Sequence, residues 1–359
     1  MSGDALPPPL AVSMGEPAGV GTEVLLKAYR HYAGLPSPER YAFFVIDDPF
    51  RLGELVRHCG LDLPIASIEC PSDARDAFAR GLPVLPLRAV DPAPLRNVKF
   101  GEPNTETAAM VLASIRQGVE AWRDGEAGGI VTLPIQKSVL QEAGFEHAGH
   151  TDFLGALTAE DPLPAGSARG PVMMLSARGF RTLPVTVHVP LTDVPKVLDS
   201  ADIIRTARIA AEALRQDFGI ASPVIAVCGL NPHAGEEGHI GREEIDVIAP
   251  AVAQLREMGI DAQGPFPADT LFHEEARRTY HACLGMYHDQ ALIPIKTLAF
   301  HEAVNVTLGL PIVRTSPDHG TALPIAGRGI ARPDSTIAAI KLAAEMASMR
   351  LSRSDQGRA

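Results

Sequence analysis

The sequence lacks several features that would assign it at once to a class of protein. Its four cysteines, Cys59, Cys70, Cys228 and Cys283, form no CxxC pair, which excludes a disulfide framework and a zinc ribbon. No apolar run approaches the roughly 18–20 residues of a membrane span. The first ten residues, MSGDALPPPL, have no basic region followed by an apolar one, so we predict no secretory signal.

The sequence also lacks a basic surplus, because it has 32 Lys and Arg against 43 Asp and Glu, which gives a net charge of −11. General nucleic-acid binders usually show a basic surplus, so we expect no nucleic-acid partner. A local basic pocket for a small anion remains compatible with this balance. Together these absences predict a soluble, cytoplasmic protein with no membrane partner.

The common nucleotide and catalytic motifs are missing as well. The first glycine-rich loop reads Gly15-Glu-Pro-Ala-Gly19-Val-Gly21, and this spacing is neither GxGxxG nor GxxxxGK[ST]. His273-Glu274 and His301-Glu302 each lack the second histidine of HExxH, and no GxSxG elbow occurs. Function must therefore be inferred from residues outside these motifs.

What is present is an alternation of apolar strands and amphipathic helices over 359 residues, enough chain for two domains. We predict strands at 10–14, 41–46, 129–133, 224–230, 283–286 and 291–295, a hairpin from 172–176 and 181–189, and helices starting near 22 and covering 105–123, 243–258 and 335–349. In the 243–258 helix, Ile245, Ile248, Val252 and Leu255 should face inward. The alternation predicts an α/β fold with a mostly parallel sheet. Residues 1–9 and those from about 350 are predicted to be loose tails.

Three histidines, His188, His233 and His288, follow predicted strands. Ligands of α/β sheets bind outside the carboxyl ends of strands, so these residues could form a three-histidine metal site with open positions. The spacings of 45 and 55 residues carry no metal signature. Ordinary loop histidines are therefore the alternative.

Two further groups of polar residues suggest an anion. In Gly149-His150-Thr151-Asp152, Thr151 or Asp152 should cap a helix starting near Phe153, and the helix N-terminus could bind phosphate. Lys296, Asn305 and Arg314 recur at nine-residue intervals in an apolar region. If buried they need partners, which a phosphate would supply; a solvated face is the alternative.

Eight ordered blocks cover nearly the whole chain: GEPAGVGTE (15–23), TLPIQK (132–137), GHTDF (149–153), HVPL (188–191), GLNPHAGEEGHIG (229–241), PADTLF (267–272), YHDQ (287–290) and NVTLGLPIVRTSPDHGTALPIAGRGIA (305–331). Together they resemble the 4-hydroxythreonine-4-phosphate dehydrogenases of vitamin B6 synthesis. The last block also resembles the adenosine loop of isocitrate and isopropylmalate dehydrogenases, which bind NAD without a Rossmann fingerprint.

The resemblance implies two α/β/α domains with mixed, mostly parallel sheets, in an isopropylmalate-dehydrogenase-like fold. The NAD domain would comprise 10–135 plus 305–350, and the metal and dimerisation domain 136–304, with a tail at 351–359. It also implies a homodimer with shared active sites, each in the interdomain cleft at the dimer interface.

The implied reaction is the NAD-dependent oxidation of 4-phosphooxy-L-threonine at C3. Decarboxylation then gives 3-amino-2-oxopropyl phosphate, a step in pyridoxal 5′-phosphate biosynthesis. NADP is a possible second cofactor. One divalent metal per site, Zn, Co, Mn, Ni or Mg, would lower the pKa of the reacting hydroxyl.

The resemblance assigns roles residue by residue. The metal ligands would be His188, His233 and His288. Substrate and its phosphate would bind His150, Thr151, Lys296, Asn305 and Arg314. The catalytic candidates are Asp289, Asp269 and Lys137, and either Asp289 or Lys137 could relay protons. The cofactor would contact Gly15, Glu16, Gly19, His319, Gly320, Thr321 and Gly327.

The chain departs from the family pattern at Gln136, Leu133 and Thr22, where many members have Asn, Ala and Pro. Pro324 replaces a usual acidic residue and offers the cofactor ribose no hydrogen bond. Paralogues acting on D-threonate or D-erythronate 4-phosphate share the phosphate residues and stay open as alternatives. Dihydrodiol dicarboxylate dehydrogenases are a second alternative, against which the predicted phosphate residues argue. A catalytically silent binding protein is the third, although no histidine ligand has been lost.

Overall fold

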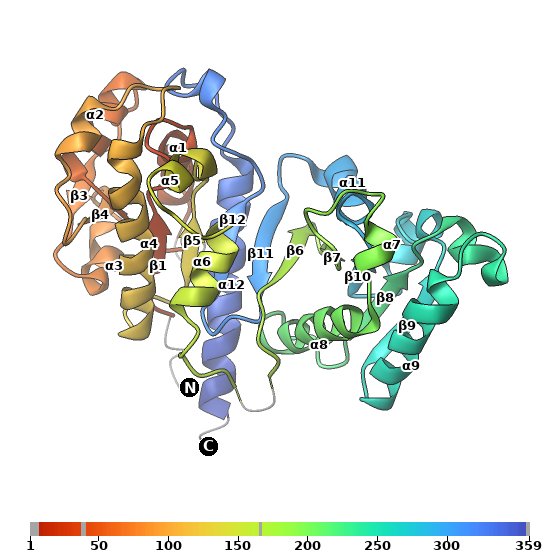
Figure 1. Cartoon of the computed structure of the whole chain (residues 1–359). Helices are drawn as coiled ribbons and strands as arrows, with labels where there is room; N and C mark the ends of the chain where they lie inside the picture. Colours follow the sequence, from red (N-terminus) through yellow and green to blue (C-terminus); the bar gives the residue numbers. More distant parts are fainter. Residues whose placement is uncertain (1–6, 37–40, 165–166, 357–359) are drawn as a thin grey trace. The chain divides into compact units, whose positions relative to one another are not determined.

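The computed structural model describes residues 7–36, 41–164 and 167–356, which form two compact units (Figure 1). Of the described residues, unit 1 comprises those within 1–161 and 311–359, and unit 2 those within 162–310. Relative to the predicted domains, residues 136–161 lie in unit 1 and residues 305–310 in unit 2. The difference arises because helices after residue 136 pack with unit 1, whereas the strand after residue 303 pairs within unit 2.

Unit 1 is built on a parallel sheet in the strand order β3-β4-β2-β1-β5-β12. Its strands are β1 (Leu10–Ser13), β2 (Phe43–Asp47), β3 (Ile65–Ser67), β4 (Leu82–Pro86), β5 (Ile130–Thr132) and β12 (Arg314–Pro317). Every residue of β1, β2, β5 and β12 is buried. Their continuous apolar character therefore reflects coverage on both faces, as in other parallel sheets.

The helices of unit 1 cover this sheet. They are α1 (Gly21–Ala33), α2 (Pro49–His58), α3 (Ala74–Ala77), α4 (Ala108–Arg123), α5 (Lys137–Glu142), α6 (His150–Leu157) and α12 (Asp334–Gln356). The α4 helix packs on β1, β2 and β5, while α12 packs on β12 and β5 and contacts α1. The α12 helix continues through Gln356, so the predicted tail from about 350 is helical as far as the structure describes it.

Unit 2 has a mixed sheet in the order β11-β6-β7-β10-β8-β9. Its strands are β6 (Val172–Ala177), β7 (Phe180–Pro184), β8 (Val224–Cys228), β9 (Asp261–Phe266), β10 (Ala282–Gly285) and β11 (Val304–Leu308). The predicted hairpin is confirmed, because β6 and β7 are antiparallel around Arg178 and Gly179, both with positive φ. Strands β7, β10, β8 and β9 are parallel, and β11 is antiparallel to β6.

The helices of unit 2 are α7 (Val194–Val197), α8 (Ser200–Gln216), α9 (Ala249–Glu257), α10 (Glu274–Arg277) and α11 (His288–Ala299). Figure 1 shows α8 and α11 with strands of this unit between them. The α11 helix contributes Ala291, Leu292, Ile295 and Ala299 to a core cluster that also contains residues of β6, β7, β8 and β10. The prediction of a mostly parallel α/β fold is confirmed.

Three local predictions are wrong. Residues 291–295 form part of α11 and no strand, since their apolar side chains recur at helical spacing on one buried face. The strand predicted to reach residue 189 ends at Pro184. Ile245 is 41% exposed because the segment 244–248 is a π-helical turn that precedes α9. Within the described residues, no helix is long and apolar enough to cross a membrane.

Candidate functional site

The three predicted metal-binding histidines lie beyond the ends of three neighbouring parallel strands of unit 2. His188 follows β7, His288 follows β10, and His233 follows β8. Strand β10 pairs with β7 on one side and with β8 on the other. Since the carboxyl ends of parallel strands meet at one edge of a sheet, the topology directs all three loops to the same edge. We call this the histidine edge.

Hydrogen bonds connect the three loops directly. The amide of Val185 donates to the carbonyl of Gly285 at 2.8 Å, and the Thr186 hydroxyl donates to that of Met286 at 2.8 Å. The buried Gln290 accepts from the Met286 amide at 2.6 Å and donates to the Gly229 carbonyl at 2.9 Å. The β10–α11 turn is therefore fixed to the segments that lead to His188 and to His233.

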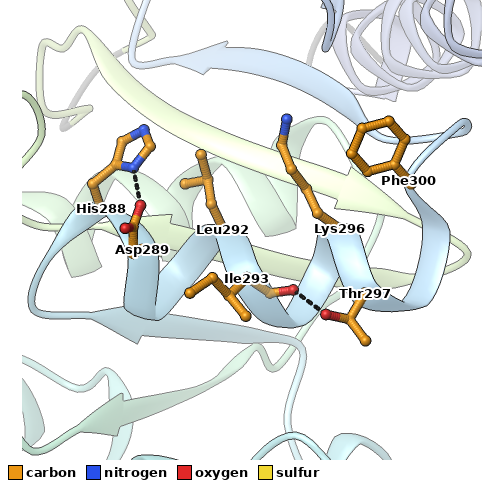
Figure 2. Close-up of a pocket in the computed structure, with 7 residues that line it drawn as sticks. All are labelled: His288, Asp289, Leu292, Ile293, Lys296, Thr297 and Phe300. Atoms are coloured by element: carbon orange, nitrogen blue, oxygen red, sulfur yellow. Dashed lines mark hydrogen bonds and ion pairs between the residues drawn. The ribbon is translucent and has the colours of Figure 1, made fainter.

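The rings of His188 and His288 are near neighbours, with centroids 6.0 Å apart. His288 Nδ1 lies 2.8 Å from Asp289 Oδ1 (Figure 2). A carboxylate at Nδ1 favours the tautomer that leaves Nε2 as the metal ligand. His188 and His288 together therefore fit a divalent cation. Within the residues that the structure describes, no group of three His, Cys, Asp or Glu is arranged around one cation position. The three-histidine set stays a prediction.

His233 and Asp269 lie on short turns after β8 and β9. His233 opens a turn at 233–237 in which every residue has positive φ. Asp269 is exposed in the 3-10 turn Ala268–Thr270, which contacts the His233 turn. Both predicted residues therefore belong to the same region of unit 2, and no side-chain contact ties Asp269 to His233 among the described residues.

One face of α11 continues from the histidine edge. Figure 2 shows His288, Leu292, Lys296 and Phe300 pointing to the same side of the helix, beside a hollow of about 510 Å³. The Lys296 Nζ atom lies 5.6 Å from the Phe300 ring centroid. Because Lys296 lies about two helical turns after His288 in α11, it places a positive charge on the same face of the helix.

The other predicted phosphate residues are divided between the units. Asn305 lies in β11 of unit 2, and its Oδ1 is buried without a hydrogen-bond partner. Arg314 lies in β12 of unit 1, is 4% exposed, and donates to Thr132 Oγ1 from Nε at 3.1 Å and from a terminal nitrogen at 2.8 Å. Burial lowers the pKa of Arg314 to about 10. The guanidinium is therefore charged at neutral pH in a low-dielectric interior, where an anion is strongly attracted.

His150 and Lys137 accompany Arg314 in unit 1. His150 Nε2 is buried without a partner, and the pKa of its imidazole is lowered well below 6.5 by burial and then by the charges of Arg314 and Lys137. Lys137 passes over Gly149, since a Cβ at that glycine would meet its Cε at 3.2 Å. We use the name cationic pocket for this cluster of three side chains, Arg314, His150 and Lys137. Its donors and charge suit a phosphate or carboxylate.

The helix start beside this pocket differs from the prediction. The α6 helix begins at His150 with Gly149 as its N-cap, and no side chain caps it. The expected capping by Thr151 or Asp152 is therefore wrong, and both residues lie in the first turn. An uncapped first turn leaves amide donors beside the cationic pocket, which favours an anion.

The predicted cofactor loops of unit 1 lie against each other. The Val20 amide donates to the Thr321 carbonyl at 2.9 Å, and a Cβ at Gly19 would lie 2.9 Å from that oxygen, so the approach requires glycine. Gly327 has φ +70 and no room for a Cβ beside Phe100. The carboxylate of Glu16 is buried, which raises its pKa, and it accepts the Ala18 amide at 3.0 Å.

The remaining cofactor candidates lie at the surface of these loops. His319 is half-buried with Nδ1 2.9 Å from the Gly320 carbonyl, and Gly320 and Pro324 are exposed. Thr321 Oγ1 donates to Gln136 Oε1 at 2.9 Å, so the Gln136 departure is accommodated by a contact with the loop. Gly19 and Thr321 lie against each other, whereas a Cβ at Gly15 would meet Leu133 and Pro134. The cofactor residues stay a prediction.

Sequence analysis missed the residues that hold the site in place. Thr132 binds Arg314, and Gln290 connects two loops of the histidine edge. Glu244 binds Asn231, just before the His233 turn. Gln290 and Thr132 lie within the YHDQ and TLPIQK blocks, but side-chain type alone gave no indication of their partners.

Comparisons with known proteins agree on one family. The model of the family described as pyridoxal phosphate biosynthetic protein PdxA matches residues 40–343. A 4-hydroxythreonine-4-phosphate dehydrogenase of Caulobacter vibrioides is 50% identical over 95% of this chain and 98% of the relative. The crystal structure of the Klebsiella pneumoniae enzyme of that name has a TM-score of 0.81 and 31% identity, covering 96% and 99% of the two chains.

A more distant structural relative is a terephthalate 1,2-cis-dihydrodiol dehydrogenase of Burkholderia xenovorans LB400. Its TM-score is 0.62 at 26% identity, and the match covers 94% of this chain and 97% of the other. The structural similarity therefore extends to a dehydrogenase whose name mentions no phosphorylated substrate.

The cationic pocket predicts an unusual titration of His150. In NMR titrations of the ligand-free protein, the His150 imidazole should titrate well below 6.5, because protonation is opposed by burial and by Arg314 and Lys137. The unfolded chain takes that proton first, so this histidine should lower folding stability as pH falls below 6.5. Lys137→Met should raise the His150 pKa by removing one positive charge. A His150 midpoint at or above 6.5 would contradict this account of the pocket.

Proposed function

The chain belongs to the pyridoxal phosphate biosynthetic protein PdxA family, and we propose that it acts as an NAD-dependent 4-hydroxythreonine-4-phosphate dehydrogenase. It oxidises 4-phosphooxy-L-threonine at C3 and decarboxylates the product to 3-amino-2-oxopropyl phosphate, a step of pyridoxal 5′-phosphate biosynthesis. The observation that carries a phosphorylated substrate is the cationic pocket, in which the buried Arg314 and the unsatisfied His150 Nε2 lie near an uncapped helix start.

The phosphate is remote from the bond that reacts, so its role is positioning. Arg314 offers a forked guanidinium and His150 a neutral ring, while the first turn of α6 with Thr151 offers amides. Lys296 and Asn305 of unit 2 are the other substrate-binding residues that we propose. The binding energy gained at these contacts serves to orient the reacting alcohol.

The histidine edge is the proposed metal site. His188, His233 and His288 would hold one divalent cation, with Zn, Co, Mn, Ni and Mg as candidates. When bound, the cation supplies Lewis acidity to the oxygen of the reacting alcohol. Asp289 orients His288 through Nδ1, and Asp269 on the adjacent turn would hold the substrate amine. Asp289 and Lys137 are the two candidates for the proton relay.

The cofactor is proposed to bind the paired loops of unit 1. The residues that would contact it are Gly15, Glu16 and Gly19 of one loop and His319, Gly320, Thr321 and Gly327 of the other. NAD, which accepts the hydride, is the proposed cofactor, and NADP is an alternative because Pro324 provides no carboxylate for the ribose. The cysteines are free thiols, which suits the reducing cytoplasm that we propose as its location.

The phosphate assignment predicts a substrate-dependent loss. Arg314→Ala should lower kcat/KM for 4-phosphooxy-L-threonine about ten- to a hundredfold, as expected for about 1.5–3 kcal/mol from a charge-assisted hydrogen bond. Arg314→Lys should also be impaired, because an ammonium lacks the guanidinium fork. Dephosphorylated 4-hydroxythreonine should be a poor substrate, and its rate should barely change in Arg314→Ala.

Steady-state NADH formation measures these rates, with Arg57→Ala as the control, because Arg57 is an exposed arginine of the same unit. Equal losses on both substrates in Arg314→Ala would show that this residue does not recognise phosphate and would favour a dihydrodiol substrate. D-threonate and D-erythronate 4-phosphate, tested in the same assay, distinguish the sugar-acid paralogues.

We further propose a homodimer in which the partner completes each active site. Large apolar side chains of unit 2 are exposed, including Leu191 at 67%, Ile293 at 61% and Phe300 at 65%. Exposed apolar residues of this size favour a protein interface. His188 and His288 are neighbours within one chain, but no three His, Cys, Asp or Glu among the described residues of that chain surround one cation position. The ligand that we expect the partner to supply, where two histidine edges meet, is therefore His233.

Mixing two inactive variants tests this sharing. His233→Ala and His288→Ala proteins, mixed equally and allowed to exchange subunits, should recover about a quarter of wild-type activity, since half of the dimers are mixed and each has one intact site. Mass spectrometry verifies the exchange. Absence of recovery in verified mixed dimers would contradict shared sites.

A further inference from the structure

The turn that carries His233 has an unusual backbone. Residues 233–237 all have positive φ, between 41° and 81°, and only Gly235 among them is a glycine. Residues with a Cβ disfavour this left-handed conformation, which normally occurs at single positions. Such a run persists only where the surrounding structure over-determines it. The contacts that impose it therefore decide where the His233 side chain lies.

Those contacts converge on the carboxylate of Glu244, which is 3% exposed. Its Oε1 accepts the Asn231 amide at 2.7 Å, and its Oε2 accepts Asn231 Nδ2 at 3.0 Å. Asn231 Nδ2 also donates to Glu243 Oε2 at 2.7 Å. The backbone amide and the side-chain nitrogen of Asn231, which precedes the turn, are therefore both bound by carboxylates that follow the turn.

The turn also closes directly on the same carboxylate. A Cβ built at Gly235 would lie 2.5 Å from Glu244 Oε2, so only glycine permits this approach. At Gly229, where Gln290 anchors the end of β8, a Cβ would lie 3.0 Å from Glu244 Oε1. Glu244 thus contacts Asn231 before His233 and Gly235 after it, and it also lies against Gly229.

We propose that Glu244 is a positioning residue, which holds the left-handed turn so that the His233 imidazole is presented at the histidine edge for a divalent cation. This inference rests on the proposed metal site. Removing the carboxylate would let the turn relax toward ordinary backbone conformations. The metal would then have to reorganise the turn before His233 could bind, and metal affinity would fall by that cost.

The test uses the metal-stripped full-length protein and Co²⁺ or Zn²⁺ alone. Glu244→Gln keeps the size of the side chain but replaces one acceptor oxygen by an amide. The affinity of this variant for Co²⁺ or Zn²⁺, measured by calorimetry, should fall about 10- to 100-fold. This is the usual loss when a group that supports a metal ligand is removed. Amide exchange at residues 233–240 should accelerate without metal, while exchange in β8 and β10 stays unchanged.

The matched control is Glu237→Gln. Glu237 is an exposed carboxylate of the same turn, with no side-chain hydrogen bond among the described residues. This variant should bind Co²⁺ as the wild type does and exchange its amides at the same rate. If Glu244→Gln does not fold, Asn231→Ser tests the same link, because it removes the side-chain bonds to Glu243 and Glu244 while keeping the backbone amide.

His233→Ala separates failure of this inference from failure of the metal site. If His233→Ala weakens Co²⁺ binding while Glu244→Gln leaves both affinity and amide exchange unchanged, the positioning role is overturned and the metal site stands. If His233→Ala itself binds Co²⁺ as tightly as the wild type, the metal proposal is wrong, and Glu244 has no ligand to position.

Discussion

The parallel pairing of β10 with both β7 and β8 is the constraint on which the candidate metal site depends. Residues about 45 and 55 positions apart in the sequence are directed to one sheet edge because three strands run in the same direction. Backbone and side-chain hydrogen bonds from Val185, Thr186 and Gln290 then fix the loops that follow. Without this pairing, the loops that carry the three histidines would not lie at one edge of the sheet.

A second constraint acts within unit 1, where positive charge is kept in a dry interior. Arg314 extends from a buried strand, and the neighbouring strand supplies Thr132 as its acceptor. The same environment keeps the His150 imidazole neutral. Burial thereby makes the site selective for an anion, since water competes weakly there and each electrostatic contact is strengthened.

Much of this arrangement could be predicted from the sequence. The position of His188, His233 and His288 after strands followed from apolar periodicity, and the eight blocks indicated the family. Residues 291–295 were mistaken for a strand because a short apolar run containing Pro294 resembles one, whereas burial of Leu292 and Ile295 on one face decided for a helix. The role of Gln290 could not be predicted, because it depends on a contact with Gly229, which is distant in the sequence. The role of Glu244 could not be predicted either, because it depends on a left-handed turn whose residues, apart from glycine, disfavour that conformation.

The metal site that we propose at the histidine edge can be located experimentally. Anomalous diffraction from crystals grown with Co²⁺ tests it most directly, with data collected on both sides of the cobalt absorption edge. We expect one strong anomalous peak per site, within about 2.0–2.2 Å of ring nitrogens of His188, His233 and His288. A dominant peak at other residues, with none at these histidines, would contradict it.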